Sequence, residues 1–235
     1  MRYLFKLLNR LQGWVEQQFP HWAHQRHRKK WERQWANPEY SPFWKTEQPQ
    51  KELVEAIESG WFQKGQRVID IGCGNGEVSR WLAEQGFPVL GIDYSAAAID
   101  NCRRLSAGQG KPISFEVADL CDDALRLDPA PALIDRGCFH RIAEIARPIY
   151  ARNVARATVP NGHYILLSGT FEDPRFANYR GARSEPALKE HVQSLFGEYF
   201  DIARCDSAII NASQDQDALP AVAFWMVRKA EAPVP

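Results

Sequence analysis

The chain has 235 residues, 45% of them hydrophobic, which is enough for one globular domain with a sizeable core. Lys plus Arg and Asp plus Glu both number 29, so no overall charge points to nucleic acid as a partner. No apolar run reaches the ~18 residues that cross a membrane, and the five cysteines form no CxxC pair, so we expect a cytoplasmic protein with reduced thiols and no metal site.

The first 35 residues predict a basic, amphipathic helical extension. They hold eight Lys or Arg against two Glu. Apolar residues recur at helical spacing, and they are Leu4, Leu7, Leu8, Leu11, Val15, Phe19 and Trp22. Three roles stay open for residues 1–30: packing on the domain or another subunit, lying on an anionic membrane surface, or touching nucleic acid through the basic run 26–30.

From residue 51 onward, helical and strand patterns alternate. We expect strands at 67–71, 88–92, 113–117, 132–135 and 163–167. We expect helices at 51–60, 76–86, 95–105, 141–158 and 186–196, with Pro148 kinking or dividing the fourth and a turn at 160–162. Residues 200–210 and 221–228 predict a closing hairpin, and residues 230–235 a frayed tail. This order predicts an α/β fold: a doubly wound, Rossmann-like seven-stranded sheet, mostly parallel with a C-terminal antiparallel hairpin and helices on both faces.

A glycine-rich turn follows the first predicted strand. Asp70, Gly72, Gly74 and Gly76 alternate there, and glycine lets the backbone turn tightly and approach a ligand closely. The free N–H groups of the next helix point to the same place. A dinucleotide fingerprint requires a further glycine where this chain has Glu77, so that pattern fails.

Acidic residues close the second and third strands. Asp93, followed by Tyr94, is placed to accept both hydroxyls of a ribose. Asp119 is placed to accept an adenine amino group, while backbone N–H groups at Leu120 meet the ring nitrogens. Capping of the next helix is the alternative role for Asp119.

The segment after the fourth strand should lie at the reactive end of the site. Asp135 and Arg136 are costly to bury unpaired, so a polar pocket is expected. His140 is the candidate general base, with a helix cap as its alternative role. Cys138 is interpreted as a small buried residue, with a nucleophile as its alternative role.

These elements together resemble the class I S-adenosylmethionine-dependent methyltransferases over roughly residues 50–228. Asp135–His140 and the aromatic segment 35–49 further resemble the branch that methylates thiopurines, thiols, halides and tellurite. The resemblance implies S-adenosyl-L-methionine as cofactor, a methyltransferase domain at 51–229, and a lid at 36–50 that closes over the site. It implies cofactor contacts at Asp70, Gly72, Gly74, Gly76, Asp93, Tyr94, Asp119, Leu120 and Asp135.

The same resemblance implies catalytic roles for His140 and Asp135 and a substrate surface made by Trp35, Tyr40, Phe43, Trp44, Arg136 and Cys138. Core packing is the alternative role for the aromatic residues. The expected reaction is in-line methyl transfer to a small-molecule acceptor, such as a thiol or another soft nucleophile. Two alternatives stay open: a protein or RNA methyltransferase, and a non-catalytic module that binds S-adenosylmethionine.

Overall fold

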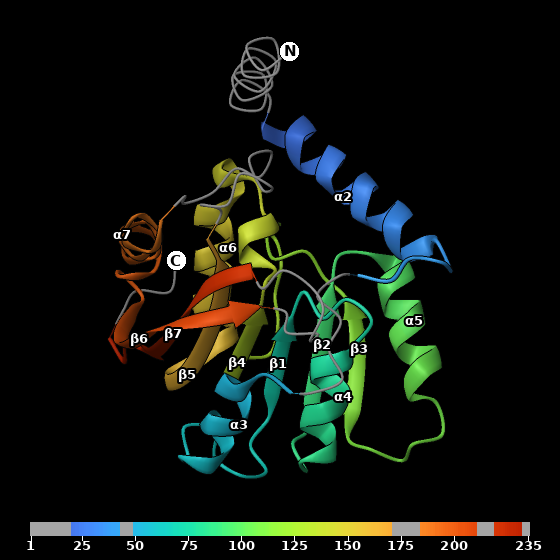
Figure 1. Ribbon diagram of the computed structural model, residues 1–235, viewed down its shortest axis with the longest axis horizontal. Helices are drawn as coiled ribbons and strands as arrows, with labels where there is room; N and C mark the ends of the chain where they lie inside the picture. The colour runs from blue at the N-terminus through green and yellow to red at the C-terminus, as the bar shows by residue number, and fades with distance from the viewer. Residues whose placement is uncertain (1–19, 43–48, 171–183, 211–218, 232–235) are drawn as a thin grey trace.

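The computed structural model describes residues 20–42, 49–170, 184–210 and 219–231. A single seven-stranded sheet has the order β3-β2-β1-β4-β5-β7-β6. The strands are β1 (Val68–Ile71), β2 (Val89–Asp93), β3 (Ile113–Val117), β4 (Ala130–Arg136), β5 (Thr158–Gly169), β6 (Phe200–Ile210) and β7 (Leu219–Arg228). Strands β1 to β5 pair in parallel, and β7 pairs antiparallel with both β5 and β6. The predicted fold class is therefore confirmed (Figure 1).

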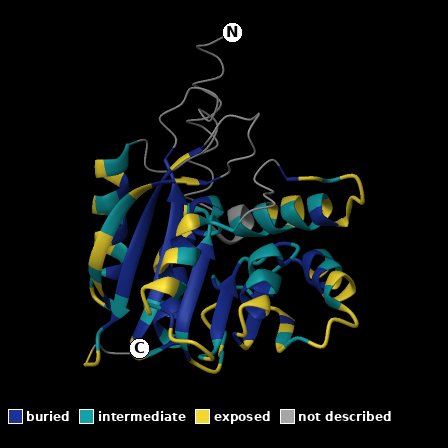
Figure 2. Ribbon diagram, turned by 60° about the horizontal axis from the view of Figure 1, so that its bottom comes forward, coloured by how far each residue is buried: buried dark blue, intermediate teal, exposed yellow. Residues whose placement is uncertain are grey.

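Helices cover both faces of this sheet. They are α2 (Pro20–Ala36), α3 (Lys51–Glu58), α4 (Glu77–Glu84), α5 (Ala96–Ser106), α6 (Arg147–Ala157) and α7 (Glu185–Phe196), with short 3-10 turns η1 (Phe139–Arg141) and η2 (Glu144–Ala146). Apolar residues of α3 and α4 share one core cluster with the sheet, and those of α6 and α7 share another. Figure 2 shows the result, with buried strands at the centre and exposed outer helix faces.

Of two local predictions, one was confirmed and one was wrong. The segment 141–158 is divided at Pro148, because η1 and η2 precede it and α6 begins with Pro148 in its first turn, where the missing N–H is no loss. The turn predicted at 160–162 was wrong. Residues 160–162 do not end a segment, because β5 runs through them with a register shift and Asn161 takes a φ of 59°. The irregularity lengthens the strand where a separate turn was expected.

Helix α2 lies beside the carboxyl ends of the central strands and packs against α5 and η2 (Figure 1). Residues 1–19 and the lid residues 43–48 lie outside the described part of the chain. The predicted roles of the N-terminal extension at a membrane or a subunit interface therefore stay predictions. Among the described helices, none combines the length and apolar character needed to cross a bilayer.

Candidate active site

A cleft lies at the carboxyl ends of β1, β2 and β4, under α2. The space inside it, counted out to the open mouth, is about 1230 Å³. Most predicted site residues line it, and they are Trp35, Asp70, Gly72, Gly74, Asp93, Tyr94, Asp119, Leu120, Arg136, Cys138 and His140. The position at strand ends follows from the doubly wound topology.

The glycine turn after β1 is shaped by close packing. Gly72 has a φ of 64°, and a Cβ there would lie 2.5 Å from the Cβ of Cys138. Gly74 has a φ of 56°, and its Cβ would lie 2.8 Å from the Trp35 ring. Any side chain at either position would displace one wall of the cleft.

Gly76 differs from the other two glycines. A Cβ there would lie 3.0 Å from the Sγ of Cys102 and 3.0 Å from the Phe115 ring, in the small core under α5. Gly76 caps α4 in the left-handed conformation and its Cβ position faces the core, and its predicted cofactor contact stays a prediction. Tyr40 also stands outside the cleft lining, with its ring edge-on to Trp35 at 5.2 Å, and Phe43 and Trp44 lie outside the described residues.

Asp93 ties the end of β2 to the glycine turn. Its carboxylate accepts the N–H of Gly74 at 3.1 Å and the N–H of Ser95 at 2.9 Å. Burial raises the pKa of Asp93 to about 6, although both hydrogen bonds favour the charged form. Such a carboxylate, at the rim of the cleft, suits two hydroxyl donors.

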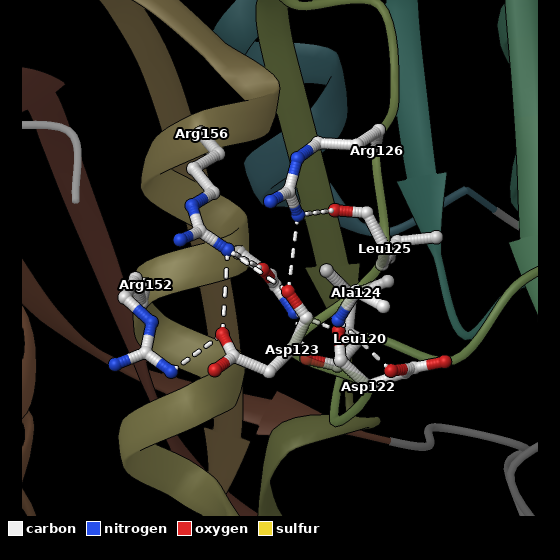
Figure 3. Close-up of polar contacts among 9 residues, drawn as sticks. Leu120, Asp122, Asp123, Ala124, Leu125, Arg126, Arg152 and Arg156 are labelled. Atoms are coloured by element: carbon white, nitrogen blue, oxygen red, sulfur yellow. Dashed lines mark hydrogen bonds and ion pairs between the residues drawn. The ribbon is translucent and has the colours of Figure 1, made fainter.

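The loop after β3 is held by α6. The side-chain amide of the buried Asn153 donates to the carbonyls of Leu120 at 3.0 Å and Asp122 at 2.7 Å. On the outside of the same loop, Asp123 accepts from Arg152 at 2.6 Å and from Arg156 at 3.4 Å (Figure 3). The backbone at Leu120 is therefore positioned before any ligand arrives.

Asp135 lies in a buried, supporting position at the end of β4, and its roles as a cofactor contact and catalytic residue stay predictions. Its carboxyl group is fully buried outside the cleft lining and accepts the Tyr150 hydroxyl. It also accepts the N–H groups of Cys138 at 2.6 Å and Phe139 at 2.9 Å. Burial raises the pKa of Asp135 to about 7. The residue thus shapes the turn that carries Cys138 and His140 into the cleft.

His140 lies in the cleft wall in a form that does not suit a base. Its Nδ1 accepts the backbone N–H of Gly169 at 3.0 Å, so the ring proton of the neutral side chain is on Nε2. Burial, reinforced by the charges of Arg141 and Arg147, lowers the pKa of His140 far below its usual value. In this tautomer the side chain donates through Nε2, which favours a donor role over the general base predicted from the sequence.

Two more predicted residues differ in character. Burial raises the pKa of the Cys138 thiol, so it stays protonated and serves as a wall residue against Gly72. Burial lowers the pKa of the Arg136 guanidinium, opposed by the nearby Glu77 and Asp70. Asp70 accepts the Ser79 hydroxyl, and burial raises its pKa to about 7.

Helix α2 supplies pocket residues that the sequence pattern missed. His24, His27 and Trp31 line the cleft together with Trp35, on one face of the helix. The Nε2 of His24 lies 2.7 Å from Oδ2 of Asp119. Within the described residues, His24, Asp119 and Cys121 are also close enough together to hold a metal ion, which no sequence spacing indicated.

The cleft matches the chemical groups of S-adenosylmethionine. Carboxylates at the ends of β2 and β3 suit ribose hydroxyls and an adenine amino group, and a glycine turn with three positive-φ residues suits close approach of an amino-acid moiety. The donor and acceptor groups are of the right kind and stand in the right order across the sheet.

Comparisons with known proteins agree with this reading. Residues 68–162 match the family model for a methyltransferase domain. The chain is 32% identical, over 159 residues, to the 2-heptyl-1-hydroxyquinolin-4(1H)-one methyltransferase of Mycobacteroides abscessus, a match covering 66% of this chain and 68% of that one. It is 30% identical over 133 residues to EEF1A lysine methyltransferase 2 of Danio rerio, covering 53% of this chain and 57% of the other.

A solved structure shares the fold. The N-methyltransferase NodS from Bradyrhizobium japonicum, in complex with S-adenosyl-L-homocysteine, superposes with a TM-score of 0.64 at 16% identity and covers 87% of this chain and 99% of that one. Together with the family match and the relative from Mycobacteroides, the cleft geometry leads to one conclusion. The chain belongs to the class I S-adenosylmethionine-dependent methyltransferases and is an enzyme that takes S-adenosylmethionine as its cofactor.

Proposed function

We propose that the enzyme methylates a small, largely apolar acceptor that binds in its ionised form. The observation that carries this proposal is the apolar part of the cleft, lined by Trp31, Ile142, Ile210 and Leu219. Burial of an apolar or aromatic molecule against such a wall is favourable by about 25 cal/mol per Å². The relative from Mycobacteroides is named for an acceptor of this kind, a heptyl-substituted hydroxyquinolone.

Bound S-adenosylmethionine supplies an electrophilic methyl group on a sulfonium centre. The residues of this chain supply position and environment, because in-line displacement requires geometry more than acid or base groups. Trp31 and Trp35 place aromatic surface in the cleft wall, and an aromatic face attracts a cation by about 1 kcal/mol. The N–H groups held by Asp135 keep the Cys138–His140 turn in place during the reaction.

His140 acts in this proposal as a donor to the acceptor's oxygen, nitrogen or sulfur, and not as its base. An Nε2 proton stabilises a negative charge nearby, which favours binding of an ionised group. Thiols fit this condition because, with a pKa of about 8.5, part of them is already ionised at neutral pH, and acidic hydroxyl groups fit it as well. The predicted branch of thiopurine, thiol, halide and tellurite methyltransferases therefore remains a source of candidate acceptors.

The test is transfer of a labelled methyl group by the full chain to a panel of acceptors. The panel contains 2-heptyl-1-hydroxyquinolin-4(1H)-one, thiophenol, tellurite, a purified elongation factor and ribosomal RNA. We expect label on a small acceptor, with a rate that rises with pH as that acceptor ionises. Label found on the protein or RNA alone would favour the macromolecular alternative, to which the Danio relative belongs.

The donor role of His140 has its own test. His140→Ala should lower kcat/KM for the acceptor while leaving the affinity for S-adenosyl-L-homocysteine unchanged, because the proposal assigns the residue to the acceptor and not to the cofactor. His140→Gln, whose amide also donates, should recover part of the activity. An activity loss in wild-type enzyme that follows protonation of a histidine near neutral pH would contradict the donor role.

A further inference from the structure

Helix α2 reaches the end of β3 through two basic side chains. The Nε2–H of His24 donates to Oδ2 of Asp119 at 2.7 Å, and Nη1 of Arg28 lies 3.6 Å from the same oxygen. The other oxygen, Oδ1, accepts the backbone N–H of Cys121 at 2.9 Å. Both carboxylate oxygens therefore have fixed directions, and one of the two is set by a helix 95 residues away in sequence.

These contacts also determine the charge of Asp119. Burial tends to raise its pKa, but the hydrogen bonds from His24 and Cys121 and the charge of Arg28 outweigh burial and hold the pKa below its usual value. An ionised carboxylate accepts hydrogen bonds and donates none. It suits the amino group of adenine and repels the keto oxygen that hypoxanthine carries at the same position.

The position of His24 follows from the way α2 is seated. The N–H of Ala97 at the start of α5 donates to the Glu32 carboxylate at 3.2 Å, and the Asn101 amide donates to the Trp35 carbonyl at 3.1 Å. The guanidinium of Arg28 lies over the ring of Tyr94, 5.8 Å from the ring centroid. These contacts hold helix α2 against the part of the cleft next to α5. The buried Trp35 lies over the glycine turn.

We propose that His24 and Arg28 belong to the cofactor site, where they orient the Asp119 carboxylate so that α2 helps the enzyme to select adenine. The residues matched by the methyltransferase family model, 68–162, do not include this helix. The inference rests on Asp119 as the acceptor of the adenine amino group. It makes α2 a part of nucleobase recognition as well as a cover over the cleft.

Calorimetry with two ligands tests the inference on the full chain. The ligands are S-adenosyl-L-homocysteine and S-inosyl-L-homocysteine, which differ in the base alone. We expect His24→Ala and Arg28→Ala each to weaken binding of the adenine ligand, with a loss of roughly tenfold for His24→Ala. Both variants should also reduce the ratio of the affinity for the adenine ligand to the affinity for the hypoxanthine ligand. Lys29→Ala is the matched control, since it removes an exposed charge from the same helix and should change neither quantity.

Asp119→Asn separates the contact between Asp119 and adenine from the role of α2 in orienting Asp119. An Asn amide donates to a keto oxygen, so this variant should shift the preference toward the hypoxanthine ligand. In that background His24→Ala should have little further effect, while His24→Gln in the wild-type background should recover most of the affinity. Unchanged binding in Asp119→Asn would show that Asp119 does not meet the adenine. Weakened binding in Asp119→Asn, with His24→Ala and Arg28→Ala indistinguishable from Lys29→Ala, would show that α2 takes no part.

Discussion

Replacing Gly72 by alanine tests the packing that shapes the cofactor turn. The new Cβ would lie 2.5 Å from Cβ and 2.6 Å from Sγ of Cys138, whereas carbon atoms in contact prefer roughly 3.5–4.0 Å. Cys138 cannot withdraw freely, because its N–H is held by Asp135 at 2.6 Å. Overpacking of this kind costs about 1–3 kcal/mol, and the left-handed backbone at a φ of 64° adds about 1–2 kcal/mol for a residue with a Cβ.

We therefore expect Gly72→Ala to lower the free energy of unfolding by about 2–5 kcal/mol and to abolish measurable binding of S-adenosyl-L-homocysteine. Gly108→Ala is the matched control, since Gly108 has a φ of 75° with nothing within 4 Å of its Cβ position, and it should lose only about 1 kcal/mol. Adding Cys138→Gly to Gly72→Ala should restore the packing part of the loss. Urea denaturation measures all three.

A loss in Gly72→Ala no greater than that in Gly108→Ala would refute the packing argument. The same conclusion would follow if Cys138→Gly gave no recovery. In either case the turn would require glycine because of its backbone conformation alone. The close approach of Cys138 would then contribute nothing to the free energy of unfolding.

Two further predictions concern buried polar groups. Burial raises the pKa of Asp135 from 3.8 to about 7, so the protonated form stabilises the folded state. This contribution to the free energy of unfolding is complete below about pH 4 and is lost as the pH rises through 7, and it amounts to at most about 4 kcal/mol. Asp135→Asn should remove that part of the slope in urea denaturation across this range, and an unchanged slope would contradict the buried, protonated state. Asn153→Ala should lower the free energy of unfolding by about 2 kcal/mol, because the carbonyls of Leu120 and Asp122 lose their donor. It should also weaken binding of S-adenosyl-L-homocysteine, measured by calorimetry. Wild-type affinity in this variant would show that the loop keeps its shape without Asn153.

The parallel sheet could be predicted from the sequence because each strand is a short apolar run closed by a turn signal. Val68–Ile71 is buried at every position, as a central parallel strand requires. The carboxyl-end positions of Asp93 and Asp119 follow from the same pattern, since residues at strand ends of a doubly wound sheet meet at one edge.

Side-chain direction could not be predicted in the same way. Asp135 and Arg136 are adjacent at the end of β4, yet Asp135 turns to Tyr150 in the core and Arg136 faces the cleft. Neighbouring residues of a strand point to opposite faces, and both faces of this sheet carry a buried core, so the sequence does not show which of the two side chains reaches the cleft. The tautomer of His140 likewise depends on Gly169, which is distant in sequence.

Three residues of α2 that line the cleft, His24, His27 and Trp31, were not predicted, because a search for apolar periodicity does not detect a helix face that contains polar residues. The apolar pattern of the N-terminal segment covers residues 4–22. The face that lines the cleft is formed by His24, His27, Trp31 and Trp35 at helical spacing, and two of these four residues are histidines. A search for mixed aromatic and histidine residues at spacings of three and four would have found it.

The most direct test of the cofactor site is calorimetry of S-adenosyl-L-homocysteine with wild-type enzyme, Asp93→Asn and Asp93→Ala. One ligand should bind per chain in the wild type, and loss of two charge-assisted hydrogen bonds to a ribose should weaken binding by roughly 100-fold in Asp93→Ala and less in Asp93→Asn. Equal affinity in all three proteins, with the variants folded, would contradict the placement of the cofactor across the ends of β1 and β2.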